Sequence, residues 1–217
     1  ARTIFESAEA SGWTILGYID REDRFDKQVS YLGQDVDIHR ILLEHPEAKC
    51  VIGIGSIEVR KRIFDALALS DERWATIIHP AAVISSSAVL GSGSVVHPKA
   101  MVHTSAHIGN HAIINSGAIV EHDCKIGTFS HIAPSATLGG GCTIGDFTLV
   151  GIGSRIRDHL TVGDNAVVGT GAVVVADVHG GQTVAGVPAV SLDRQQAARL
   201  EVKSLCVPKT SSLRDVM

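Results

Sequence analysis

Aliphatic residues recur at every sixth position of this chain, without a gap, from Ile78 to Val174. Four residues after each of them comes a small side chain, and only Leu160 and Val178 break this second rule. A period of six fits neither a helix, with about 3.6 residues per turn, nor a strand, whose side chains alternate. The pattern predicts short strands separated by tight turns, with aliphatic side chains pointing inward and small ones at the corners.

Hexapeptide repeats of this kind are typical of β-helices. If three hexads close one coil, residues 18 apart lie above one another as parallel strands, about 4.8 Å apart. The 17 hexads of this chain then make between five and six coils. We expect the β-helix domain to cover residues 78–190.

Before the repeat, strand-like and helix-like segments alternate. The elements we predict are a helix over 3–11, a strand over 14–20, a helix over 37–44 capped by Asp37, a buried strand over 49–55, and a helix over 57–69 capped by Ser56. Such alternation implies a small parallel α/β layer, Rossmann-like in kind, over residues 1–77. Ligands of such layers bind at the carboxyl ends of the strands, here near Asp20 and Gly55. A C-terminal tail with a possible helix over 193–204 makes up residues 191–217.

The α/β layer begins with a helix, which is unusual for a unit that alternates strand and helix. We therefore expect a first strand and its Gly-rich turn, on the order of ten to twenty residues, to precede Ala1. The alternative is a layer that simply starts with a helix.

Composition divides the chain at the same place. Of its 217 residues 45% are hydrophobic, yet only nine are aromatic, and seven of those nine lie before residue 75. Residues 78–179 hold 14 of the 22 glycines but only 10 of the 42 charged residues. A narrow prism that repeats one slot leaves no room for rings, so the aromatic residues mark a separate domain with a boundary near residues 74–79.

Charge and cysteine content exclude several classes of protein. A formal net charge of −4 disfavours nucleic acid binding, which needs clustered Lys and Arg. No apolar run approaches the ~18 residues of a membrane span, so we expect no membrane insertion. Four cysteines do not make a disulfide framework, which favours a reducing cytoplasm, and we interpret Cys124 and Cys142 as buried thiols. His103, His107 and His111 fall on three different repeat positions, so we predict no metal site.

One polar cluster stands out in a repeat that carries so few charges, namely Glu121-His122-Asp123. A histidine next to a carboxylate is a suitable general base near neutral pH, because the carboxylate fixes the tautomer and stabilises the imidazolium. The alternative interpretation is a solvent-exposed turn without chemistry.

The run INSGAIVEHDCKIGTFSHIAPSATLGGG (residues 114–141) resembles the left-handed β-helix acyltransferases of the sialic acid O-acetyltransferase type. It is most similar to the bacterial UDP-4-amino-sugar N-acetyltransferases, and the resemblance extends from the N-terminal layer through GVPA (residues 186–189). The left hand follows from this resemblance alone, since the general rule for crossovers predicts a right-handed one. The resemblance implies an acetyl-CoA-dependent N-acetyltransferase that acts on the 4-amine of a nucleotide-linked amino sugar. His122 would be its base, and Asp123 would raise the basicity of that base.

The same resemblance implies the other site residues. Acetyl-CoA, as co-substrate, would contact His131, Ile152, Gly169 and Gly171. A backbone N–H of the Gly139–Gly141 turn, with Gly140 at its centre, would stabilise the tetrahedral oxyanion. The nucleotide sugar would contact Asp20, Arg21, Gly55 and Asn115, although the family's N-terminal Gly-rich loop, which also binds the nucleotide, is absent from this sequence.

Members of this family are trimers with active sites between neighbouring β-helices. We therefore expect a homotrimer in which His122 meets His131 and the Gly139–Gly141 turn across a subunit boundary.

Three other functions remain open. The first is O-acetylation of a sialic acid or related sugar, with the same base and donor. The second is a zinc β-helix of the carbonic anhydrase type, which needs a pair of histidines five residues apart that the repeat does not contain. The third is a structural or binding β-helix, which would not need the cluster around His122. The identity of the acceptor sugar and its nucleotide stays open.

Overall fold

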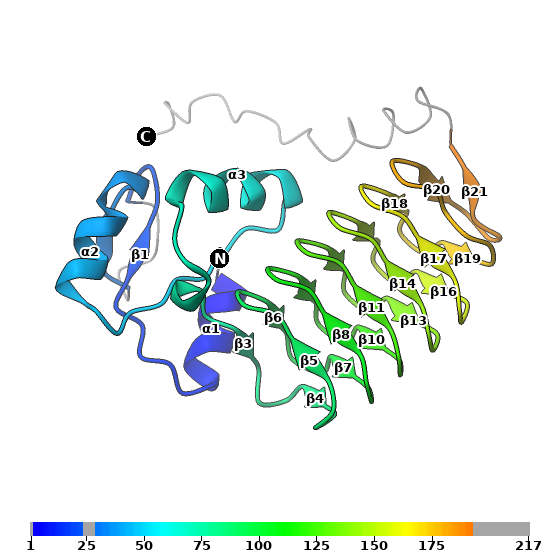
Figure 1. Ribbon diagram of the computed structural model, residues 1–217, viewed down its shortest axis with the longest axis horizontal. Coiled ribbons are helices and arrows are strands. Elements are labelled where there is room, and N and C mark those ends of the chain that lie inside the picture. The colour runs from blue at the N-terminus through cyan, green and yellow to red at the C-terminus, as the bar shows by residue number, and fades with distance from the viewer. Residues whose placement is uncertain (1, 24–28, 193–217) are drawn as a thin grey trace, which may run out of the picture.

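The computed structural model describes residues 2–23 and 29–192 of the chain. Figure 1 shows the helices gathered at the N-terminal end of a long ladder of strands, with α3 lying over the first coils. The C-terminal helix that we predict over residues 193–204 lies outside the described residues.

The hexads form two-residue strands that each end on the aliphatic residue of the pattern. These strands are β3 Ile77–Ile78, β4 Val83–Ile84, β5 Val89–Leu90, β6 Val95–Val96, β7 Met101–Val102, β8 His107–Ile108, β9 Ile113–Ile114, β10 Ile119–Val120, β11 Lys125–Ile126, β12 His131–Ile132, β13 Thr137–Leu138, β14 Thr143–Ile144, β15 Leu149–Val150, β16 Arg155–Ile156, β17 Thr161–Val162, β18 Val167–Val168 and β19 Val173–Val174. After them come β20 Thr183–Ala185 and β21 Val190–Ser191.

The strands stack into three parallel sheets that form the faces of a prism. Face 1 contains β4, β7, β10, β13, β16 and β19, face 2 contains β5, β8, β11, β14 and β17, and face 3 contains β3, β6, β9, β12, β15, β18 and β20. The register pairs residues 18 apart, such as Val102 with Val120. A parallel β-helix with three hexads per coil is therefore confirmed.

Three rows of turns connect the faces, and we name them by the faces that they join. Corner 1–2 contains the turns after β4, β7, β10, β13 and β16, and it includes residues 121–124 and 139–142. Corner 2–3 contains the turns after the strands of face 2, and corner 3–1 those after the strands of face 3. From Gly93 to Gly171 the third residue after each aliphatic has a positive φ, as the third position of a type II turn requires.

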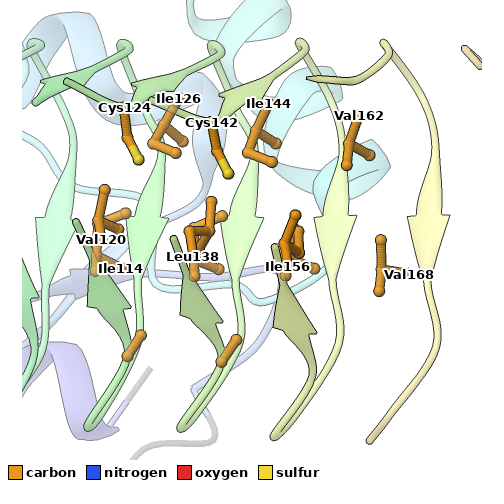
Figure 2. Close-up of a cluster of buried hydrophobic side chains, with 14 of the residues drawn as sticks. Ile114, Val120, Cys124, Ile126, Leu138, Cys142, Ile144, Ile156, Val162 and Val168 are labelled. Atoms are coloured by element: carbon orange, nitrogen blue, oxygen red, sulfur yellow. The ribbon is translucent and has the colours of Figure 1, made fainter. Parts of the chain in front are cut away.

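The interior of the prism is filled by the aliphatic residues of the pattern, as predicted. Ile132 and Val150 are fully buried, whereas Ile78 at the open first coil is 37% exposed. Figure 2 shows the aliphatic side chains stacked in rows, with Cys124 and Cys142 beside them. Both cysteines are buried free thiols, which confirms their interpretation, and they donate to backbone carbonyl oxygens of the next coil.

The α/β layer is less regular than its pattern suggests. Its elements are α1 Arg2–Ala10, β1 Tyr18–Ile19, β2 Tyr31–Gly33, the 3-10 turn Asp35–Asp37, α2 Ile38–Glu44, α3 Ile57–Leu67 and the 3-10 turn Asp71–Arg73. Strand β1 is parallel to β2, so the predicted layer contains parallel strands, although β2 was not among the predicted elements.

Several predicted boundaries in this layer are wrong. The strand over 14–20 shrinks to β1, and the segment 49–55 forms only an isolated bridge from Cys50 to Trp74. Helix α3 ends at Leu67 because Ala68 adopts a left-handed conformation with φ 45°. Ser56 caps α3 as predicted, since its Oγ accepts the Val59 N–H at 3.3 Å.

Asp37 does not cap the helix that follows it. Its Oδ2 instead accepts the Gln34 N–H at 2.9 Å within the preceding 3-10 turn. A short polar side chain at the start of a helix has this alternative whenever a turn precedes the helix.

The layer packs on face 3 and on corner 2–3. Ile4 and Ala8 of α1 form one buried cluster with Ile77, Val95 and Ile113 of face 3. A cavity of about 1070 Å³ lies within the layer, between β1 and residues 49–54.

Candidate active site

His122 and Asp123 form a bonded pair on corner 1–2. His122 Nδ1 lies 2.8 Å from Asp123 Oδ2, and the two side chains are 57% and 65% exposed. Asp123 has a φ of 60°, which Asp tolerates better than most side chains. The hydrogen bond to Asp123 raises the pKa of His122 above its usual value, helped by the charges of Asp123 and Glu121. Because Nδ1 is held, Nε2 is the nitrogen that remains for a ligand.

The Gly139–Gly141 turn lies directly against the His122 ring. A Cβ on Gly140 would come within 2.5 Å of His122 Cε1 and Nε2, so only glycine leaves room for the ring. Gly141 N–H donates to His122 O and Gly139 N–H to Ile156 O. Among the described residues Gly140 N–H makes no hydrogen bond, so it is the free donor of this turn.

The expectation that His122 meets this turn across a subunit boundary is wrong. Gly140 comes 18 residues after His122, so the repeat itself stacks the two in one chain.

A second cluster joins Asn115, His131 and Gly55 at the seam between the α/β layer and face 3. Asn115 Nδ2 lies 3.0 Å from His131 Nε2, and the backbone of Gly55 lies near enough to the His131 ring to affect its pKa. Burial, with the nearby Arg60 charge, lowers the pKa of His131 to about 4. His131 is therefore a neutral ring whose Nε2 is bonded to Asn115.

A third group lies farther along corner 3–1. Gly171 N–H donates to Ile152 O at 2.8 Å, and the Ile152 side chain is 53% exposed. A Cβ on Gly171 would meet nothing within 4 Å, whereas one on Gly169 would lie 2.9 Å from the Ala185 Cβ. The structure therefore brings Ile152, Gly169 and Gly171 together on a strip of nearly bare backbone.

Asp20 and Arg21 form a fourth group, after β1. Asp20 N–H donates to Gly33 O at 3.2 Å, and Gln34 Nε2 donates to Arg21 O at 3.0 Å. Both residues line the cavity of the α/β layer together with Ile54, next to Gly55. Asp20 and Arg21 thus share one hollow with Ile54, whereas Gly55 is not among the residues that line it.

These groups occupy different sides of the prism. His122, Asp123 and Gly140 lie on corner 1–2, whereas Ile152 and Gly171 lie on corner 3–1, at the other edge of face 1. A single chain therefore does not bring the base and the predicted acetyl-CoA residues together.

Among the buried polar residues of the seam that sequence reasoning missed are Arg60 and His111. Arg60 of α3 is 2% exposed and His111 of corner 2–3 is 4% exposed. His111 packs against the rings of Phe64, Trp74 and Phe129, with centroid distances of 4.6 to 5.0 Å, and burial lowers its pKa to about 4. For Arg60 a signal existed, because position 60 lies on the apolar stripe of α3.

The part of the chain that the structure describes contains no group of three His, Cys, Asp or Glu side chains that could hold a metal ion. The three histidines considered above are dispersed. His103 contacts Met101, His107 is exposed, and His111 lies in the aromatic cluster. Within the same residues no helix is long and apolar enough to span a bilayer.

Two families match the chain. The PglD N-terminal domain covers residues 1–67, and the bacterial transferase hexapeptide (six repeats) covers residues 105–140. A variant of perosamine N-acetyltransferase from Caulobacter crescentus, in complex with CoA and GDP-perosamine, is 31% identical with a TM-score of 0.82. That match covers 88% of this chain and 91% of the other. The acetyltransferase domain of PglB from Neisseria gonorrhoeae, in complex with acetyl coenzyme A, is 32% identical, with a TM-score of 0.81 and coverage of 88% and 93%.

The fold and the corner 1–2 turn define a left-handed β-helix acyltransferase of the hexapeptide type. The chain belongs to the hexapeptide-repeat sugar N-acetyltransferases, as its identity to perosamine N-acetyltransferase over most of both chains shows. UDP-N-acetylbacillosamine N-acetyltransferase from Bacillus subtilis is 40% identical over 50 residues, a match that spans 23% of this chain and 23% of that relative.

Proposed function

We propose that this protein transfers the acetyl group of acetyl-CoA to the 4-amine of a nucleotide-linked amino sugar. The observation that carries the proposal is the His122–Asp123 pair, because its 2.8 Å contact leaves Nε2 of an exposed, basic imidazole for a substrate. The relatives support this class of acceptor, since one binds GDP-perosamine and another is named for a UDP-linked sugar. They differ in nucleotide, so the base of the nucleotide is the first thing to determine.

His122 acts as the general base. With its proton on Nδ1, bonded to Asp123, the neutral ring presents the Nε2 lone pair to the amine. Nε2 takes the amine proton as the nitrogen bonds to the carbonyl carbon of the thioester. When the carbon–sulfur bond breaks, His122 returns that proton to the departing sulfur.

The described residues around His122 also supply a hydrogen-bond donor for the oxyanion and no reactive thiol. Gly140 N–H lies beside His122 and is free, so it can donate to the oxygen on which negative charge develops. Cys124, the thiol nearest in sequence, is fully buried and bonded to Gly139 O, so it cannot form an acyl-enzyme. Direct attack by the amine follows.

The bare strip on corner 3–1 suits a long, thin ligand such as CoA. The open space at Gly171 and the exposed Ile152 leave backbone and one apolar side chain for contact, with Gly169 behind them. His131 can accept a hydrogen bond from an amide N–H of the ligand at Nε2 if Asn115 yields that position. We assign acetyl-CoA to these residues.

We assign the nucleotide sugar to Asp20, Arg21, Gly55 and Asn115. Asp20 and Arg21 line the cavity of the α/β layer, and Gly55 and Asn115 meet at His131. A sugar held between the two parts can reach a reaction centre at the edge of the β-helix.

We further propose a homotrimer, because the base and the acetyl-CoA strip lie on different corners of one prism. Corner 1–2 of one chain would then face corner 3–1 of its neighbour. Light scattering tests this, and a stable monomer that is fully active would contradict it.

The test of the function is a thiol-release assay with acetyl-CoA and a panel of UDP-, GDP- and dTDP-linked 4-amino sugars, with free sialic acid as a hydroxyl acceptor. We expect turnover with one amino sugar and a fall in kcat of about 100- to 10,000-fold in His122→Ala. The control is His39→Ala, which removes another exposed histidine, from α2. Release only with sialic acid would indicate O-acetylation, and a fully active His122→Ala would exclude His122 as the base.

A further inference from the structure

Arg60 is a buried cation without a carboxylate partner among the described residues. Its side chain lies on the inner face of α3 and is 2% exposed. The nearest acid in sequence, Glu58, bonds Ser56 instead. Burial lowers the pKa of Arg60 to about 10, so it stays charged at neutral pH. An unpaired buried charge is costly, and a structural position on this stripe would be filled more easily by an apolar residue.

The Arg60 guanidinium joins two parts of the molecule. Nη1 donates to Gly55 O at 2.8 Å, in the loop before α3, and Nη2 donates to Phe129 O at 2.5 Å, in the turn before β12. Nε has no partner within the described residues. One side chain therefore fixes both the loop assigned to the nucleotide and the start of the strand that carries His131.

Gly55, whose carbonyl Arg60 holds, also lies at the His131 ring, where its backbone partly offsets the lowering of the His131 pKa. Asn115 Oδ1 accepts the Ser116 N–H at 2.8 Å, so Nδ2 is the Asn115 atom that faces His131 and donates to Nε2, 3.0 Å away. A neutral ring that accepts through Nε2 carries its proton on Nδ1, which the Gly55 carbonyl can accept. The orientation of the whole chain of bonds depends on where Gly55 O lies.

Charge works in the same direction as geometry. The titratable groups that face His131 are Arg60 and His97, and both disfavour a proton on its ring. A protonated His131 would have donors at both nitrogens and could no longer accept from an amide. Arg60 thus keeps Nε2 in place and unprotonated, as an acceptor for Asn115 or for a ligand that displaces it.

We propose that Arg60 is a positioning residue for acetyl-CoA, which holds His131 neutral, with Nε2 as an acceptor, through the shared Gly55 carbonyl. This rests on the proposed function, because it takes His131 as a contact of acetyl-CoA. Arg60 does not approach corner 1–2, so the proton transfer at His122 is independent of it.

Three variants test the proposal. Arg60→Met keeps the length and removes the charge and all donors, whereas Arg60→Lys keeps the charge but cannot donate to Gly55 and Phe129 as a fork. Lys61→Met is the matched control, because Lys61 is the next cation of α3, 40% exposed and paired only with Asp65. Each variant is assayed for CoA affinity by calorimetry, for kcat and KM, and for the His131 tautomer by nitrogen-15 NMR.

For Arg60→Met we expect CoA affinity to fall and the KM for acetyl-CoA to rise, each about 10-fold. This is the effect expected when one hydrogen bond to a buried group is lost. We expect kcat to change less than 3-fold, a margin of about 0.7 kcal/mol. The His131 resonances should show loss of the fixed Nδ1–H tautomer. Arg60→Lys should lie between, and Lys61→Met should match the wild type.

A folded Arg60→Met with wild-type CoA affinity, KM and His131 tautomer would overturn the proposal. If Arg60→Met does not fold, Arg60→Lys decides by the same three measurements. Failure of the proposed function looks different, since wild-type enzyme would then bind no CoA or His122→Ala would stay active. The His131 tautomer in the Arg60 variants can still be measured in that case.

Discussion

His122 and His131 lie nine residues apart in the chain, yet their surroundings shift their basicity in opposite directions. On corner 1–2, a carboxylate and solvent raise the pKa of His122. At the seam, burial beneath the α/β layer lowers the pKa of His131 to about 4. The ring of His122 is therefore the more basic of the two, whereas the ring of His131 stays neutral at neutral pH.

The difference comes from position in the repeat. His122 is a turn residue of an uncovered corner, whereas His131 starts a strand on the outer side of face 3, which α3 and its preceding loop cover. Every coil of the prism has the same set of positions, and the α/β layer that packs on it determines which positions are excluded from solvent. The chemistry of a histidine in this fold thus depends on what is packed on that side of the prism.

The largest effect that we expect concerns stability at low pH. His111 and His131 have folded pKa values of about 4, against about 6.5 when unfolded, so the unfolded chain takes up protons first as pH falls. Their stabilising contribution is complete above pH 6.5 and is lost as pH falls toward 4. Between pH 7 and 5 the free energy of unfolding should drop by about 2 kcal/mol per histidine at most. Denaturant unfolding at several pH values measures this.

A substitution can isolate the share of His111. Phe129 and Phe147 occupy the equivalent turn position in the next two coils with φ of 60° and 56°, so His111→Phe extends a stack that the fold already contains. This variant should lose the part of the pH dependence between pH 7 and 5 that His111 contributes, which should equal the part from His131. An unchanged slope would show that His111 is not a source of it.

Asp123→Asn tests the exposed histidine of the comparison, His122. Asn accepts a positive φ, so the turn should persist, but His122 loses the carboxylate that raises its pKa. We expect kcat to fall about 10- to 100-fold, because the tautomer is no longer fixed and the base is weaker. The acid limb of the kcat–pH profile, which reports loss of the neutral base, should move to lower pH. An acid limb that does not move would show that Asp123 does not raise the pKa of the catalytic base.

Gly140→Ala should have the smallest effect of the three. The new Cβ would overlap the His122 ring, which must rotate away, and because the ring is exposed the fold should lose less than about 1 kcal/mol. We expect kcat to fall about 10-fold at nearly constant KM. Gly180→Ala is the matched control, since its Cβ would meet only the Asp164 backbone, at 3.1 Å. Equal kcat in both variants would argue against the packing of His122 on Gly140.

The β-helix could be predicted to the residue because its core repeats. Each aliphatic from Val96 to Ile156 lies between aliphatic residues 18 positions before and after it, so local pattern and tertiary packing agree. The α/β layer has no such redundancy. Residues 49–55 look like a buried strand, but Cys50 pairs only with Trp74, and the carbonyls of Ile54 and Gly55 face Arg60 instead of a neighbouring strand.

The candidate site divides along the same line. The pairing of His122 with Asp123 could be predicted, because the two are adjacent and share one turn. The contact of His131 with Gly55 joins residues 76 apart in sequence and depends on how the layer docks, which no local pattern encodes. Arg60 shows why such residues are missed. In the sequence it only interrupts the apolar stripe of α3, and its role becomes visible when the carbonyl groups that it bonds are known.

The constant spacing of the coils fixes the distance along the β-helix axis between any two positions of the repeat. At about 4.8 Å per coil, Ile152 and Gly171 stand roughly 8 and 13 Å farther along the axis than His122. Inserting or deleting one coil of 18 residues between them would preserve the pattern of inward contacts but move the strip relative to the base by about 4.8 Å along the axis. If acetyl-CoA binds to the strip as we propose, the number of coils sets how long the donor must be to reach His122.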